Sequence, residues 1–366
     1  MYDTIYVSYT ALQIHLRRNM MTKRNSYLDV AKFLFSIIII LYHFDVFFLG
    51  GYIVVEAFFM ISGFFLMSSV KKSDDTLPLG EQTAKFVAHK YKSIAFFLIP
   101  SAIIGCIAYI WIIPRPTESV LMQASLMIFE MLPTQVAGFN GFYATGVSWY
   151  LSALFIGCMI VFPLAKRFKT GFTLWIAPLA AILCYGYLTC NFSYIGVPNL
   201  WINQLFNSGL LRAIAGLCAG CFLHECSVRL GDKRPSLTGK ILMTLLEVVG
   251  WGYCVYVMHN YPESMYDASV VFIMFGLLLI GINRYSYLTD LIQFRWTKHL
   301  ATVSTVVYLN HYYWGRLILK VLPDLSRGKQ IALYLALIAV SSTFVYFVGR
   351  LLMTLWDKRK KRALQN

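Results

Sequence analysis

Two apolar stretches near the start of the chain decide the class of fold. Residues 28–48 read LDVAKFLFSIIIILYHFDVFF, and residues 53–70 read IVVEAFFMISGFFLMSSV. Each is close to the roughly 20 apolar residues that a helix needs to cross a bilayer. Gly50 and Gly51 lie between them and favour a tight connection. The sequence therefore predicts two neighbouring membrane helices at this point.

The composition extends this interpretation to the whole chain of 366 residues. Apolar residues make up 58% and charged residues only 13%, whereas soluble domains carry roughly 45–50% and about 25%. An ordinary soluble enzyme is excluded. We expect an all-α, polytopic membrane bundle of about ten transmembrane helices, although residues 209–224 and 268–282 are short for a crossing. The eight runs beyond the first two are residues 93–113, 147–165, 172–190, 209–224, 241–258, 268–282, 300–319 and 331–355.

The charge excess has a topological explanation. Lys and Arg number 32 against 17 Asp and Glu, a net charge of +15. With ten crossings and a cytoplasmic N-terminus, most cations fall in cytoplasmic segments, as the positive-inside rule expects. The outside loops hold only Arg115, Lys320, Arg327 and Lys329. We therefore expect both termini in the cytoplasm, membrane lipid around the protein, and no nucleic-acid partner.

Three segments result from this topology. Residues 1–27 form a basic cytoplasmic segment, residues 28–355 the membrane domain, and residues 356–366 a basic cytoplasmic tail. Residues 1–19 contain no long apolar run, whereas Met20 and Met21 open a compact basic stretch before the first membrane helix. We therefore expect translation to begin at Met20 or Met21. Nothing in the sequence indicates an oligomeric state.

Ionisable residues inside membrane segments are costly, so each suggests a function. Lys32 and His43 are 11 residues apart, which places them on one helix face with a rise of roughly 16 Å. Glu56 should lie at a depth similar to that of His43 on the next helix. We interpret His43 as a general base oriented by Glu56, and Lys32 as a contact for an anionic ligand. The alternatives are a lysine that reaches the headgroups and a purely structural histidine–carboxylate pair.

Other polar or small residues could support such a site. Ser62 and Gly63 allow close approach of a backbone or a thin ligand, and Arg212 is a cation buried by the predicted topology. His311, in VYLNHYYW, is the second candidate for a functional histidine, the alternative being tight packing among its aromatic neighbours.

The segment CAGCFLHEC raises the question of a metal site. Cys218, Cys221, His224 and Cys226 fall close together there, with the first two on one helix face. Small and soft residues in membrane helices usually serve packing, so we predict no metal ligands.

The opening motifs resemble a known family. Lys32, ten residues, then His43 in LYHF, followed by Glu56 and FFMISGFF, are similar to the opening of the acyltransferase-3 family of integral membrane acyltransferases. SWYLSALF at residues 148–155 and STVVYLNH at residues 304–311 are softer matches. The family normally has arginine where this chain has Lys32, which keeps the charge but loses the bidentate geometry suited to phosphate.

This resemblance implies an activity and roles for the matching residues. The family transfers an acyl group, commonly acetyl, from cytoplasmic acyl-CoA to a hydroxyl of an extracytoplasmic or lipid-linked glycan. His43 would be the catalytic base and Lys32 would help to hold the acyl-CoA, which is a co-substrate rather than a bound cofactor. We expect a multi-pass protein of the bacterial inner membrane. The alternative is a transporter or flippase for a glycan or small anion, lined by the same ionisable residues.

Overall fold

The computed structural model describes residues 25–112, 117–139, 141–197, 200–202, 206–231, 233–294 and 296–363. These residues are almost entirely helical, which confirms the all-α prediction. The predicted start at Met20 or Met21 lies outside them. The α-helices are α2 (Ser26–His43), α3 (Val54–Lys72), α4 (Leu79–Ile112), α5 (Thr117–Leu126), α6 (Ile128–Met131), α7 (Trp149–Gly171), α8 (Ala177–Phe192), α9 (Ser208–Leu230), α10 (Leu237–Asn260), α11 (Tyr266–Asn283), α12 (Tyr287–Leu291), α13 (Thr297–Val321) and α14 (Arg327–Ala363). The short elements are η1 (Gly51–Ile53), η2 (Gln135–Ala137), the π-helical η3 (Phe172–Ile176) and the paired antiparallel strands β1 (Trp201–Ile202) and β2 (Phe206–Asn207).

Every apolar run identified in the sequence lies largely or wholly within helix. The two short runs are parts of longer helices, since α9 has 23 residues and α11 has 18. Among the described residues, eight stretches are long and apolar enough to cross a membrane. One of them, Trp149–Phe192, contains both α7 and α8, and α13 is not among the eight. The chain is a multi-pass membrane protein, while ten crossings and cytoplasmic termini stay predictions.

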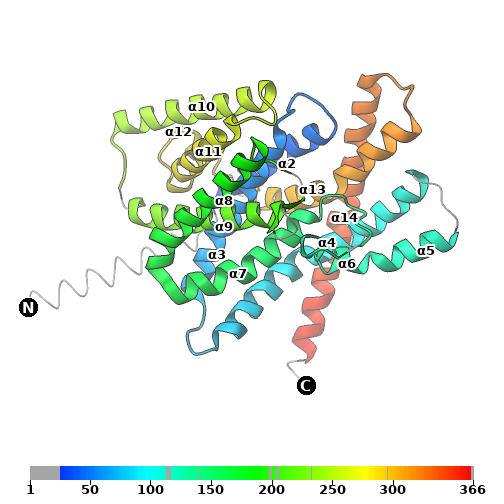
Figure 1. The fold of residues 1–366 in the computed structure, drawn as a ribbon, viewed down its shortest axis with the longest axis horizontal. Helices are drawn as coiled ribbons and strands as arrows, with labels where there is room; N and C mark the ends of the chain where they lie inside the picture. Colours follow the sequence, from blue (N-terminus) through cyan, green and yellow to red (C-terminus); the bar gives the residue numbers. More distant parts are fainter. Residues whose placement is uncertain are drawn as a thin grey trace, which may run out of the picture.

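Two helix pairs form the centre of the bundle, α3 with α9 and α2 with α13 (Figure 1). The first pair crosses closely because Gly63 and Gly220 face the partner helix. A β-carbon at Gly63 would collide with the carbonyl oxygen of Leu217, and one at Gly220 with that of Met60. Small residues at such a crossing let two membrane helices approach backbone to backbone. Gly63 thus serves helix packing.

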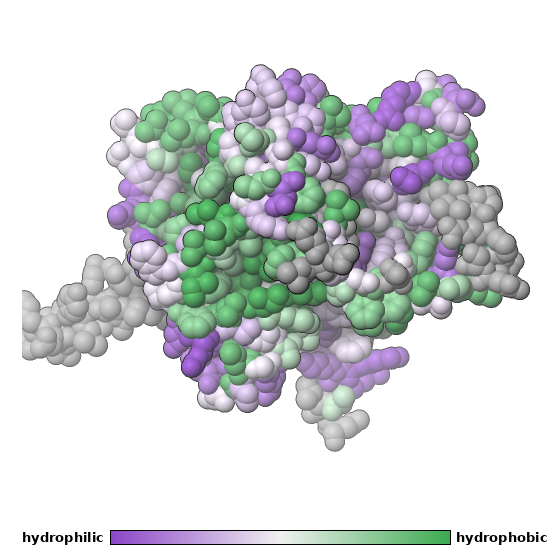
Figure 2. All heavy atoms as spheres, in the orientation of Figure 1, coloured by the Kyte–Doolittle hydropathy of each residue, from purple (hydrophilic) through white to green (hydrophobic). Residues whose placement is uncertain are grey.

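The outer surface of the bundle is apolar. Figure 2 shows hydrophobic residues across the middle of one face, with hydrophilic residues gathered mainly toward its upper and lower edges. On α10, Leu245 is 57% exposed and Val249 67%, and on α14 Phe347 is 66% exposed. Apolar side chains at this exposure indicate helices that face lipid tails.

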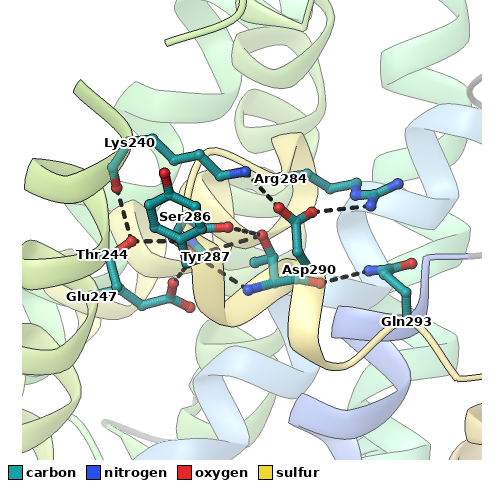
Figure 3. A network of polar contacts seen from close by, with 9 residues as sticks. Lys240, Thr244, Glu247, Arg284, Ser286, Tyr287, Asp290 and Gln293 are labelled. Atoms are coloured by element: carbon teal, nitrogen blue, oxygen red, sulfur yellow. Dashed lines mark hydrogen bonds and ion pairs between the residues drawn. The ribbon is translucent and has the colours of Figure 1, made fainter. Parts of the chain in front are cut away.

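A polar network joins α10 to the loop and short helix that follow α11 (Figure 3). Lys240 Nζ lies 2.5 Å from Asp290 Oδ2, and Arg284 Nη2 lies 3.0 Å from Asp290 Oδ1. The hydroxyl of Ser286 donates to the buried carboxylate of Glu247. These contacts attach the N-terminal half of the peripheral helix α10 to the rest of the protein. Much of the other surface of α10 faces outward.

Helix α2 ends at His43, five residues earlier than the apolar run suggests. The expectation that residues 44–48 continue the helix is therefore wrong. Asp45 (φ 50°) and Phe47 (φ 63°) have left-handed backbone conformations, which a helix cannot contain. Arg327 donates to the carbonyl oxygen of Phe44, whose ring stacks on Tyr334 at 4.2 Å. Tertiary contacts thus end the helix and fix His43 at its last residue.

Candidate functional site

Two histidines from different helices meet at the end of α2. The half-buried ring of His43 lies 5.1 Å, centroid to centroid, from the ring of His311 in α13. Tyr312 meets His43 edge to face at 5.2 Å. His311 is fully buried, and its Nδ1 lies 2.6 Å from the carbonyl oxygen of Tyr308. The structure thus brings both candidate histidines into one cluster, here called the histidine pair.

Glu56 is hydrogen-bonded to residues other than the histidine pair. Its Oε1 lies 2.6 Å from Nε of Arg212, and its Oε2 accepts a 2.8 Å hydrogen bond from the hydroxyl of Tyr185. Both partners of this ion pair are buried. Among the described residues, no hydrogen bond joins Glu56 to His43. The expected orienting contact between them is therefore absent, because the carboxylate side chain is already held by α8 and α9.

The guanidinium of Arg212, like the carboxylate of Glu56, has several contacts to protein groups. Nη1 donates to the carbonyl oxygen of Val197 at 2.9 Å, and the guanidinium lies 5.0 Å from the ring centroid of Trp149. A buried guanidinium with this set of partners is fixed in place. The Glu56–Arg212 pair therefore ties α3 to α9 and to the segment that precedes β1.

A cavity of about 180 Å³ is lined by residues of α2, α3, α4, α7 and α13. Neither His43 nor His311 is among the described residues that line it, but Tyr308, which does line it, contacts the ring of His311. Lys32 and Lys90 contribute positive charge to its lining, and Ser62 contributes a hydroxyl. Lys32 Nζ lies 4.8 Å from the ring centroid of Phe65, and the hydroxyl of Ser304 donates to the Lys32 carbonyl oxygen at 2.9 Å. The site therefore contains a basic end, which includes the lysine that the sequence singled out.

Aromatic rings line the part of the cavity away from Lys32. Phe58, Tyr150 and Tyr308 line it, come from α3, α7 and α13, and lie 5.7–6.3 Å apart between ring centroids. Phe58 precedes Phe65 by seven residues, so the aromatic end lies roughly 10 Å along α3 from the level of Lys32. The Tyr308 ring is also 5.7 Å from that of His311. This three-ring cluster therefore links the cavity with the histidine pair.

The loop before α7 forms a wall of the site. The buried carboxylate of Glu130 accepts hydrogen bonds from the backbone nitrogens of Ala144 (2.8 Å) and Thr145 (3.0 Å). The next residue, Gly146, has a positive φ of 68° and lies so close to the ring of Tyr312 that no side chain would fit. Glu130 thus holds the loop against the tyrosine that contacts His43.

Sequence reasoning missed several of these residues. Lys90 counted only as a loop cation, yet α4 begins at Leu79 and carries Lys90 into the cavity. The apolar residues Phe86, Val87 and Tyr91 at helical spacing could have revealed this extension. Tyr150 and Tyr308 lie in SWYLSALF and STVVYLNH, the two softer matches to the family, but neither was predicted as a site residue.

The whole bundle matches one family of enzymes. The family model of the acyltransferase domain, acyltransferase-3, matches residues 25–350. The chain belongs to this family. It is therefore a membrane acyltransferase, which resolves the alternative between an enzyme and a transporter. No curated protein and no solved structure matches it.

Proposed function

We propose that the protein transfers a short acyl group, acetyl in the simplest case, from acyl-CoA to a hydroxyl of a glycan or lipid-linked sugar. The observation that carries this proposal is the cavity lined by two lysines and by the three-ring cluster, whose Tyr308 ring contacts His311 of the histidine pair. Lys32 and Lys90 suit the phosphates of the donor, since lysine binds phosphate as a point charge. The bacterial inner membrane is the proposed location.

The histidine pair supports the chemical step. His43 removes the proton of the acceptor hydroxyl, whose oxygen attacks the thioester carbon. The carbon–sulfur bond breaks, and the CoA thiolate takes up the proton from His43. General-base catalysis of this kind contributes roughly 10²–10⁴-fold to a rate. Glu56 has a structural part in this proposal, because Arg212 and Tyr185 hold its carboxylate.

The three-ring cluster is an argument that the transferred acyl group is short. Phe58, Tyr150 and Tyr308 line the cavity, and the Tyr308 ring contacts that of His311. A two-carbon group needs less room there than a longer chain, and apolar pockets discriminate by about 10–200-fold per methylene. We therefore expect acetyl-CoA to be used in preference to butyryl-CoA.

Membrane vesicles that contain the protein provide the test. They are incubated with labelled acetyl-CoA or butyryl-CoA, and label is measured in the glycan and lipid-linked sugar fractions. We expect acetyl transfer by the natural protein and by His89→Ala, which alters an exposed histidine of α4, but none by His43→Ala. Equal transfer by His43→Ala and the natural protein would exclude His43 as the base, and transfer of butyryl in preference to acetyl would exclude the short acyl group.

A further inference from the structure

The hydrogen bond of His311 fixes which of its nitrogens can accept another. Nδ1 lies 2.6 Å from the carbonyl oxygen of Tyr308. A carbonyl oxygen can only accept, so Nδ1 carries the hydrogen. In a neutral imidazole the other nitrogen, Nε2, then has a free lone pair. The backbone of α13 therefore prepares His311 as an acceptor at Nε2.

This acceptor is buried and has no hydrogen-bond partner among the described residues. An unpaired buried acceptor is costly, so it calls for an explanation. The neighbouring ring with a nitrogen to donate is His43, at 5.1 Å between centroids. Two imidazoles that share an N–H···N hydrogen bond end to end have centroids about 5 Å apart. No hydrogen bond joins the two rings among the described residues, so the half-buried His43 ring must rotate to form one.

The geometry points to His311 as the positioning residue of His43. Its Nε2 accepts the N–H of His43, which leaves the other nitrogen of His43 bare and directed at the acceptor hydroxyl. When His43 takes the hydroxyl proton, His311 keeps the resulting imidazolium in place until the CoA thiolate removes that proton. His311 itself gains and loses nothing over the cycle. This inference rests on the proposed function and replaces Glu56 by His311 as the group that orients the base.

A second buried histidine serves as a matched control. Both ring nitrogens of His224 in α9 are also buried without a partner among the described residues. Its described ring contact is with Phe64, at 5.1 Å, and not with another histidine. Replacement of His224 should therefore leave the chemical step unchanged, whatever it does to packing.

Two substitutions of His311 separate positioning from packing. His311→Asn keeps a group that can donate to the Tyr308 carbonyl oxygen but lacks an acceptor at the place of Nε2. His311→Gln places its amide oxygen near that position. We expect His311→Asn to lower kcat for acyl transfer by roughly 10–100-fold per folded molecule, with the KM for acetyl-CoA nearly unchanged. His311→Gln should recover most of the kcat, and His224→Asn should match the natural protein.

An equal loss in the Asn and Gln variants, or an unchanged kcat in His311→Asn, would overturn the inference and leave the proposed function intact. If the natural protein transfers no acyl group at all, the proposed function fails instead. ¹⁵N NMR of histidine-labelled protein then still tests the contact. The resonance lost in His311→Asn should be that of an unprotonated Nε2, and it should shift in His43→Ala. A protonated Nε2, or no shift, would contradict the inference.

Discussion

The Glu56–Arg212 pair and the histidine pair are both polar clusters within the helix bundle, but they differ in how completely their buried polar atoms are hydrogen-bonded. Both Glu56 oxygens and the Arg212 guanidinium have short contacts to protein groups. In the histidine pair, the buried Nε2 of His311 lacks one among the described residues. Buried polar groups that are fully paired stabilise an arrangement of helices, whereas an unpaired buried acceptor calls for an explanation, which the inferred contact with His43 supplies. The Glu56–Arg212 pair therefore joins helices, whereas catalysis is the role proposed for the histidine pair.

The largest expected effect on stability comes from breaking the ion pair. Arg212→Met leaves the buried carboxylate of Glu56 without its cation, which typically costs about 3–5 kcal/mol. Thermal unfolding of the purified protein in detergent measures this loss. Arg350→Met, at an exposed arginine of α14, should change stability by no more than about 0.5 kcal/mol. Similar unfolding temperatures for the two variants would contradict a structural part for Arg212.

A smaller effect, on donor binding, is expected at the basic end of the cavity. Lys32→Ala should raise the KM for acetyl-CoA roughly tenfold, equivalent to about 1.4 kcal/mol, because one charge contact with the donor is lost. Steady-state kinetics at varied acetyl-CoA give this value. Lys85→Ala removes an exposed lysine of the same helix as Lys90 and should leave the KM unchanged. A fall in kcat at constant KM would place Lys32 in the chemical step rather than in donor binding.

The smallest effect is expected at the polar network of α10 and α12. The hydrogen bond from Lys240 lowers the pKa of Asp290. A carboxylate with a lowered folded-state pKa stabilises the protein above its unfolded pKa of about 3.9 and loses that contribution as the pH falls. Because this pair is partly exposed, Asp290→Asn should cost at most about 1 kcal/mol at neutral pH.

Unfolding temperatures recorded from pH 7 to pH 3 check this expectation. The natural protein should lose stability relative to Asp290→Asn as the solution becomes acidic, because only the natural protein has this carboxylate to protonate. Acyl transfer at neutral pH should be the same in both proteins, since the network does not contribute to the cavity lining. A constant difference in stability across the pH range would show that Asp290 acts only through packing.

Sequence patterns predicted the helices well and the site in part. Hydrophobic runs identify membrane helices because a segment that crosses lipid must be a continuous apolar helix. The prediction that Lys32 and His43 share one face of a helix follows from their 11-residue spacing and helix geometry. The sequence could not predict where α2 ends, because Arg327 and Tyr334, which fix the turn after His43, lie far along the chain. It could not predict the partner of Glu56 either. Similar depth along two helices gives no information on the direction of a side chain, and Glu56 contacts α9 rather than His43.

The most direct test of the assignment compares His43→Ala with Glu56→Gln, each measured as acyl transfer per folded molecule. We predict that His43→Ala loses at least roughly 10²-fold in turnover while it stays folded. Glu56→Gln should lower the amount of folded protein but keep turnover per folded molecule within about tenfold of the natural value. A folded Glu56→Gln protein as inactive as His43→Ala would contradict the division into a structural ion pair and a catalytic histidine pair.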